Sequence, residues 1–253
     1  MDTVKVNQDF YEKHWMATWK YNFMYDPNSK VRMALYCMDQ LGGRPRNKKI
    51  LDIGFGFGKI LFSLDPSNLI CGVELAEGAV QKAIQRARRK GYPRFDFKVY
   101  EGTGALPYND AQFDMVICSH VLEHVPDDRT LLAEIKRLLA PEGTAILNIP
   151  IHEEHFPDPR HMRKYTVEGF RNLIRDYGFE IRYDYAGDKF WDLFGWFFEK
   201  NWHKRIPVLG FLISSALNIG FSSIPFPVQR AIERMLPRRI NPRQFIVAVQ
   251  HKR

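Results

Sequence analysis

Three glycines and two acids make up the first group of residues whose types and spacing could bind a ligand. Asp52 lies in a short apolar run, and Gly54, Gly56 and Gly58 follow it at alternate positions. Glu74 ends a second apolar run, 20 residues after Gly54. Glycine lets the backbone approach a ligand closely, and a carboxylate at this place can accept hydrogen bonds from ribose hydroxyls. The pattern indicates a cofactor that contains a nucleoside.

Histidines in two segments make up the second group. The segments 118–127 and 150–166 each follow an apolar run. If both runs are strands of a parallel sheet, the segments leave it at the edge where ligands bind in open α/β sheets. Histidine has an intrinsic pKa near neutrality and can accept a proton from a reacting group, and a structural role is the alternative for each one. The candidate bases are His120, His124, His155 and His161.

Alternating strand and helix patterns from about 49 to 186 must position these groups. This alternation predicts a parallel sheet covered by helices on both faces. The predicted strands are 49–53, 69–74, 95–100, 113–118, 144–149, 179–185 and 244–250. The predicted helices are 58–64, 77–90, 128–139, 166–177 and 227–236, with Thr166 as the cap of its helix.

The glycine pattern departs from the dinucleotide fingerprint G-x-G-x-x-G, because the third glycine comes one position early and Lys59 stands in its place. The form Asp-x-Gly-x-Gly-x-Gly, with an acid ending the second strand, resembles the class I S-adenosylmethionine (SAM) methyltransferases. The resemblance implies an α/β fold with a doubly wound, mainly parallel sheet of seven strands, the last inserted antiparallel. It also implies SAM as the cofactor. The alternative is a structural turn in another doubly wound domain.

The resemblance also assigns cofactor contacts. In that family the glycine turn packs against the methionine part of SAM, the second acid binds the ribose, and the loop after the third strand holds the adenine. That loop often carries an aspartate, and Gly102 stands at its position here. The implied contacts are Asp52, Gly54, Gly56, Gly58, Glu74, Leu75, Gly102, Thr103, Gly104 and Ser119.

Two segments are similar to narrower groups within the family. The run 118–127 resembles the Glu-x-x-Glu-His segment of the ubiquinone-biosynthesis O-methyltransferases, which bind a divalent metal there. Glu123 and His124 match, whereas His120 replaces the first acid. Imidazole and carboxylate suit such ions, but a similar turn without metal is common in the family, so we assign no metal ligand. The run 161–166 resembles a segment of small-molecule and lipid methyltransferases.

Composition and length divide the chain into a core and two additions. With 253 residues, of which 45% are hydrophobic, the chain can form one large domain with an insertion. We expect an aromatic-rich helical cap at 1–45, a core at 46–187 plus 241–253, and a helical insertion at 188–240. The N-terminus shows no signal peptide. The three cysteines lack a metal spacing, and two lie in predicted strands, so a reducing, cytoplasmic location is expected.

The insertion is apolar and basic. Six of the nine residues at 190–198 are aromatic, and basic residues follow at 200–205. The stretch 206–221 is uncharged, but it is shorter than the roughly 20 residues that span a bilayer. Aromatic and basic residues side by side, with a formal net charge of +8, favour docking on anionic lipid. We therefore predict a SAM-dependent methyltransferase that is peripheral on the inner face of a membrane and takes a lipophilic acceptor, such as a quinone precursor or another lipid.

Three alternatives remain open. The insertion could be a lid or a homodimer interface in a soluble methyltransferase acting on a small molecule or sugar. A nucleic-acid methyltransferase fits the charge, but no base-flipping motif is present, and the basic helix 77–90 is interpreted as a solvated face, so no nucleic-acid partner is expected. A SAM-binding scaffold without catalysis is the third.

Overall fold

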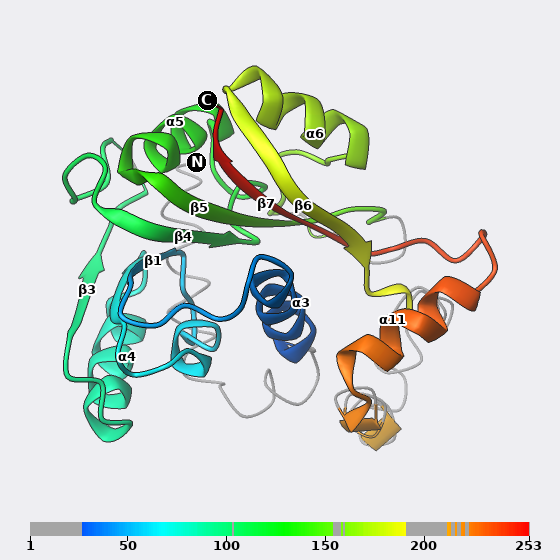
Figure 1. Ribbon diagram of the computed structural model, residues 1–253, viewed down its shortest axis with the longest axis horizontal. Coiled ribbons are helices and arrows are strands. Elements are labelled where there is room, and N and C mark those ends of the chain that lie inside the picture. The colour runs from blue at the N-terminus through cyan, green and yellow to red at the C-terminus, as the bar shows by residue number, and fades with distance from the viewer. Residues whose placement is uncertain are drawn as a thin grey trace.

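The fold is built on a seven-stranded, mainly parallel sheet with the strand order β3-β2-β1-β4-β5-β7-β6 (Figure 1). The computed structural model describes residues 27–102, 104–153, 158, 160–190, 212–213, 216, 219–220 and 223–252. The strands are β1 (Lys49–Ile53), β2 (Leu69–Glu74), β3 (Phe95–Val99), β4 (Phe113–Ser119), β5 (Leu139–Pro150), β6 (Phe179–Gly187) and β7 (Gln244–His251). β7 pairs antiparallel with both β5 and β6, as predicted for the last strand.

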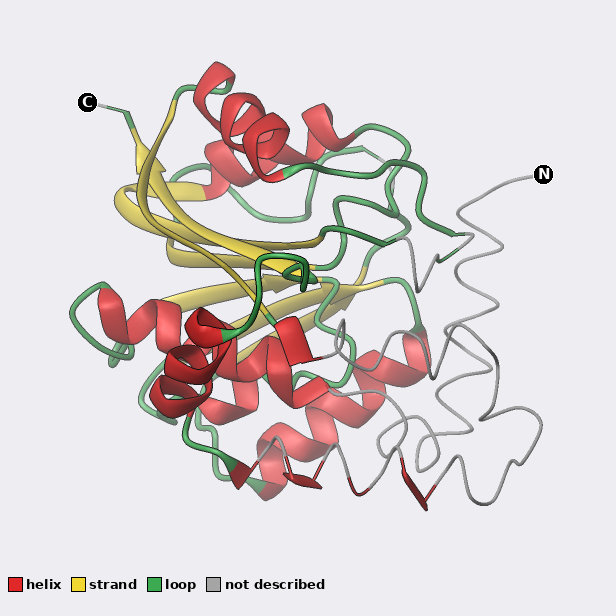
Figure 2. Ribbon diagram, turned by 90° about the vertical axis from the view of Figure 1, so that its right-hand side faces the viewer, coloured by secondary structure: helices red, strands yellow, loops and turns green. Residues whose placement is uncertain are grey.

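Helices cover both faces of this sheet, as the alternating pattern predicts (Figure 2). α3 (Pro27–Gln40) and α4 (Glu77–Arg89) pack on one face, and α5 (Asp128–Leu138) and α6 (Val167–Asp176) pack on the other. α11 (Phe226–Met235) lies on the α3 side, where Phe226 joins the core. Strand side chains alternate between the two cores: Ile50 packs with α3 and α4, whereas Leu51 packs with α5 and α6.

Two predicted elements differ from the structure. The helix predicted at 58–64 is wrong, because only a 3-10 turn at Leu61–Ser63 forms there. Gly58 has a φ of +62°, and Pro66 disfavours helical geometry at the residue before it, so too few residues remain for an α-helix. β5 is longer than predicted, because it begins at Leu139 and its register against β4 shifts between Phe113 and Met115. The predicted Thr166 cap is confirmed, since its side chain accepts a hydrogen bond from the Gly169 N–H.

Several sequence predictions lie outside the described residues. These are the aromatic residues of 1–26, the aromatic and basic run 191–205, most of the apolar stretch 206–221, Thr103 and His155. Among the helices that the structure describes, none has the length and apolar character to cross a membrane.

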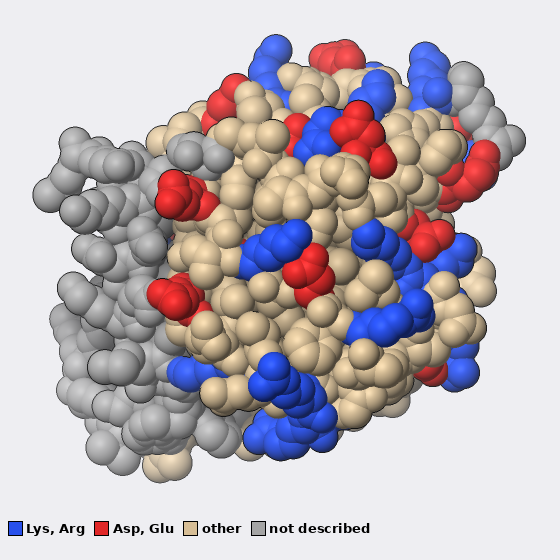
Figure 3. Space-filling model, turned by 90° about the vertical axis from the view of Figure 1, so that its left-hand side faces the viewer, with Lys and Arg blue, Asp and Glu red and all other residues tan. Residues whose placement is uncertain are grey.

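The basic helix α4 behaves as a solvated surface. Lys82, Arg88 and Arg89 are exposed, and the face of the molecule with β3 and α4 mixes positive and negative side chains (Figure 3). Arg86 donates to the Phe57 carbonyl at 3.0 Å. Cations in the last turn also suit the helix dipole.

Candidate functional site

The glycine loop and the first histidine segment lie next to each other because β1 and β4 are neighbouring parallel strands. Ile53, at the end of β1, pairs with Cys118, near the end of β4. A Cβ built at Gly54 would lie 2.5 Å from the Val121 Cγ2 atom, so the two loops are in direct contact. The carboxyl edge of the sheet therefore brings together the two groups that the sequence singles out.

The glycine loop is a cradle with one open side. Gly54, Gly56 and Gly58 all have positive φ angles, of 65°, 53° and 62°, which non-glycine residues rarely adopt. No described atom lies within 4 Å of a Cβ built at Gly56, although the Gly56 N–H is held at 2.8 Å by a Glu74 carboxylate oxygen. Glu74 thus fixes one side of the loop, and described residues leave the other side of Gly56 uncovered. This arrangement fits the methionine part of SAM.

Glu74 and Asp52 form a buried acidic pair behind this loop. The other Glu74 oxygen accepts the Leu75 N–H at 2.8 Å, so the carboxylate stiffens the loop. Binding of ribose hydroxyls by Glu74 stays a prediction. Burial and the Glu74 charge raise the pKa of Asp52 well above its usual value.

The loop after β3 has the form expected of an adenine site, without its usual acid. Gly102 and Gly104 have φ angles of 77° and 76°. The Tyr100 hydroxyl donates to the Gly104 carbonyl at 2.6 Å and holds the loop close to the end of β3. Recognition of the adenine through backbone groups remains a prediction.

His120 directly follows the last residue of β4. It has a φ of +56°, a strained conformation that clusters at functional sites. Its Nδ1 atom lies 3.3 Å from a carboxylate oxygen of the buried Glu123. Its Nε2 atom lies 3.3 Å from the Gln244 side-chain oxygen. Glu123 and Gln244 therefore flank the ring on both sides.

Gln244 is the centre of a hydrogen-bond network that sequence reasoning missed. Its oxygen accepts from Asn148 Nδ2 at 3.0 Å, and its Nε2 donates to Asp188 at 2.5 Å and to Ser29 Oγ at 3.2 Å. These partners come from β5, the end of β6 and α3, and Ser119 also contacts Asn148, at 3.5 Å. The sequence signal that could have revealed this network was a polar residue in each of two apolar runs, Asn148 in 144–149 and Gln244 at the start of 244–250.

Burial and a nearby cation favour the neutral form of His120. Burial lowers the pKa of His120, and the ammonium of Lys30, in the first turn of α3, lowers it further. Burial alone would raise the pKa of Glu123, but the contact with His120 and the charge of His124 lower it. A neutral imidazole with its proton on Nδ1, 3.3 Å from an ionised Glu123, agrees with both pKa directions. Its Nε2 lone pair then faces the Gln244 oxygen, so this contact becomes a hydrogen bond only when the ring is protonated. Lys30 was also missed from the sequence.

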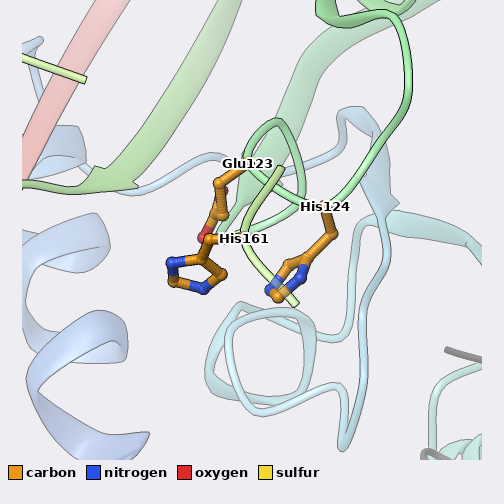
Figure 4. A group of neighbouring side chains, drawn as sticks. All are labelled: Glu123, His124 and His161. Carbon is orange, nitrogen blue, oxygen red and sulfur yellow. The ribbon is translucent and has the colours of Figure 1, made fainter. Parts of the chain in front are cut away.

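His124 and His161 pack against each other beside this pair. Their rings form an edge-on contact with centroids 4.6 Å apart, and the Glu123 carboxylate points toward them (Figure 4). Burial lowers the pKa of His124 to about 4. His161 contacts Glu153; burial opposes protonation, but this contact and nearby carboxylates raise the pKa of His161.

Glu123, His124 and His161 have ligand atoms within 4.8 Å of one another, a spacing that a divalent ion could use. Two of the three are already engaged, Glu123 by His120 and His161 by Glu153. Both Glu123 carboxylate oxygens and the Nδ1 atoms of His124 and His161 are buried with no hydrogen-bond partner among the described residues, so these atoms could ligate an ion. The close contacts with His120 and Glu153 compete with that ion, and no step of the proposed reaction requires a metal.

Strained backbone recurs along the same edge. His152, after β5, and Asp188, after β6, have φ angles of 52° and 68°. The Arg243 guanidinium donates to the His152 carbonyl, so the segment after β5 is tied to the residue before β7. Non-glycine residues with positive φ angles thus follow β4, β5 and β6, and such strained backbone often occurs at functional sites.

Comparisons with known proteins agree with this geometry. Residues 51–147 match the family model described as a methyltransferase domain. The ubiquinone biosynthesis O-methyltransferase of Leptothrix cholodnii is 26% identical over 132 residues, which cover 49% of this chain and 56% of that protein. The 27-O-demethylrifamycin SV methyltransferase of Amycolatopsis mediterranei is 33% identical over 103 residues, 39% of this chain and 37% of that protein. The chain thus spans about half the length, or less, of these curated relatives.

A solved structure extends the likeness to nearly the whole fold. The cyclase SpnF matches with a TM-score of 0.64 and 18% identity, over 97% of this chain and 96% of that one. Identity this low supports the fold alone, and a fold can host different reactions. The family match at 51–147 is specific, because it covers the glycine loop, Glu74 and the His120 segment. Residues 51–147 of this chain therefore match a methyltransferase domain, and the sequence around the glycine loop is similar to that of known methyltransferases.

Proposed function

We propose that this protein transfers a methyl group from SAM to a lipophilic or membrane-associated small molecule, such as a quinone precursor or another lipid. The observation that carries methyl transfer is the shared edge of β1 and β4, which sets the open glycine loop beside the His120–Glu123 pair. A donor in the loop and an acceptor next to His120 would face each other. The quinone class is supported by the name of the Leptothrix relative.

The reaction requires the protein mainly to position the reactants, because the methyl donor is already activated. SAM, when bound, supplies an activated methyl group on a sulfonium sulfur. The residues must hold the acceptor in line with the methyl–sulfur bond and exclude water. For an oxygen acceptor, the new carbon–oxygen bond forms as the methyl–sulfur bond breaks, and the electron pair of the broken bond stays on sulfur. The hydroxyl proton then needs a base.

Among the four candidate histidines, His120 is the one we propose as this base. Glu123 orients the ring through Nδ1, which leaves Nε2 to accept the proton. Once protonated, Nε2–H can donate to the Gln244 oxygen, 3.3 Å away. His124 and His161 pack against each other instead. Asp52, Gly54, Gly56, Gly58, Glu74, Leu75, Gly102, Thr103, Gly104 and Ser119 are proposed for the cofactor.

We also propose that the protein works as a peripheral protein at the cytoplasmic face of a membrane. Two large apolar side chains of the insertion support this, because Leu212 and Ile219 are 56% and 59% exposed. The Amycolatopsis relative favours a second candidate, a soluble enzyme acting on a small molecule, in which the insertion is a lid or a dimer interface.

The test is methyl transfer to a total cell extract. The protein is incubated with methyl-labelled SAM and the extract, and products are partitioned between organic solvent and water. Label in the organic phase supports a lipid acceptor. Label only in water-soluble small molecules rejects the lipid acceptor and favours the second candidate. Label in neither phase, with saturable SAM binding, contradicts methyl transfer to any acceptor of the extract.

A further inference from the structure

α11 packs Phe226 on the core, but further along it buries polar side chains and exposes apolar ones. Gln229 and Glu233 are only 4% and 3% exposed, whereas Val228 and Met235 are 49% and 85% exposed. Val228 and Met235 are seven residues apart, two helical turns, and therefore share one face, together with the exposed Ala231. Water-soluble helices normally show the opposite arrangement.

Specific contacts fix this orientation. The Glu233 carboxylate accepts the Tyr185 hydroxyl at 2.7 Å and the Lys189 N–H at 3.1 Å. The Arg230 guanidinium lies 4.4 Å from the centres of both the Tyr36 and Tyr185 rings. Turning the helix to bury its apolar face would break these contacts and leave the polar groups that make them without hydrogen-bond partners. The contacts of the buried face therefore force the apolar face of α11 to point outward.

The outer face is flanked by positive charge. Arg234, Arg238 and Arg239 are exposed, and within the described residues no ion pair joins any of the three to a carboxylate. Glu233 is the single acid in the sequence between 223 and 243, and it points inward. The surface thus combines exposed apolar side chains with guanidinium groups that lack nearby negative partners.

We propose that this surface, formed by Val228, Ala231, Met235, Arg234, Arg238 and Arg239, docks on an anionic lipid bilayer. The apolar side chains would enter the boundary between headgroups and acyl chains, and the arginines would bind lipid phosphates. A symmetric contact with a second copy is less suitable, because it would bring the same arginines together. The inference rests on the proposed function and locates its membrane contact on α11, whereas sequence reasoning assigned it to the insertion 188–240 as a whole.

Vesicle flotation of the full chain tests this surface. We expect flotation with vesicles of phosphatidylcholine and phosphatidylglycerol, and little with phosphatidylcholine alone. The variant R238Q/R239Q should bind the anionic vesicles roughly 30-fold more weakly, at about fivefold for each charge. The matched control is R88Q/R89Q, an exposed arginine pair on α4. The variant V228D/M235D should lose flotation with its SAM affinity unchanged, which shows that it is folded.

Three results would overturn the proposal. The first is no flotation with either vesicle. The second is an equal loss for R88Q/R89Q and R238Q/R239Q, because bulk charge would then explain binding. The third is a dimer in light scattering that V228D/M235D converts to a monomer, because a second copy would then cover the face. Flotation without label in any organic phase contradicts the lipid acceptor but not this surface, whereas label without flotation contradicts the surface alone.

Discussion

The donor side and the acceptor side of the candidate site differ in how far apart along the chain their residues lie. On the donor side, the Gly56–Glu74 hydrogen bond joins residues separated by 18 positions. On the acceptor side, the hydrogen bonds of Gln244 join it to residues 56, 96, 124 and 215 positions away. The donor side is one local strand–turn–strand unit, whereas the acceptor side exists only once the sheet and α3 are assembled. Changes on the two sides should therefore have separable effects.

The largest expected effect comes from H120N, on the acceptor side. Asparagine tolerates the positive φ at this position and cannot act as the base. We expect kcat to fall about 10²- to 10⁴-fold, the usual contribution of a general base, with SAM affinity unchanged. Steady-state kinetics and calorimetric SAM titration measure both quantities. Near-normal turnover in H120N would move the base to another residue.

G54A is the corresponding change on the donor side. The new Cβ would meet Val121 Cγ2 at 2.5 Å, and alanine would be strained at a φ of +65°. We expect SAM binding, measured by calorimetric titration, to weaken by at least about tenfold. The free energy of unfolding, measured in urea, should fall by about 1–3 kcal/mol.

G43A provides the control for G54A, because Gly43 has a φ of +114° and no described atom lies within 4 Å of a Cβ built there. Alanine is strained at this position too, but Gly43 lies away from the site. If G43A and G54A weaken SAM binding equally, contact between the two loops does not matter for the cofactor.

Q244A should give a smaller and more selective effect. Without the Gln244 side chain, His120 loses its Nε2 partner and Asn148 loses its acceptor. We expect kcat to fall about tenfold with little change in SAM affinity, corresponding to the loss of about 1.4 kcal/mol of transition-state stabilisation. Q250A on the same strand, which removes a hydrogen bond to Thr144, is the matched control. Equal losses in the two variants would reduce Gln244 to a structural role.

Removal of divalent metal should have the smallest effect. Because Glu123 and His161 are engaged by His120 and Glu153, chelator-treated protein should keep its SAM affinity and turnover. Elemental analysis of the protein before chelation checks occupancy. One equivalent of bound metal, with turnover lost on chelation and restored by adding the ion, would show that Glu123 is a ligand rather than the partner of His120.

Several features of the fold could be predicted from particular residues. The strand ends at Ile53 and Glu74 follow from apolar runs that stop at glycine or acid, and the final antiparallel strand follows from the family resemblance. The 3-10 turn at Leu61–Ser63 was missed because apolar spacing over a few residues does not separate it from an α-helix. Lys30 and Ser29 were missed because nothing near them in the sequence marks a site about 90 residues further on.

The glycine loop, the acid behind it and the parallel strands that set them at a carboxyl edge can be predicted from residue order alone, because these depend on local backbone geometry and on side-chain periodicity. Residue type also singles out His120 and Glu123. The partners that surround His120 depend on the assembled fold, since Gln244, Asn148, Asp188 and Ser29 meet through pairing of distant strands and packing of α3. The assembled fold also turns the apolar face of α11 outward, because the inner face must satisfy Glu233 and Arg230 against Tyr185.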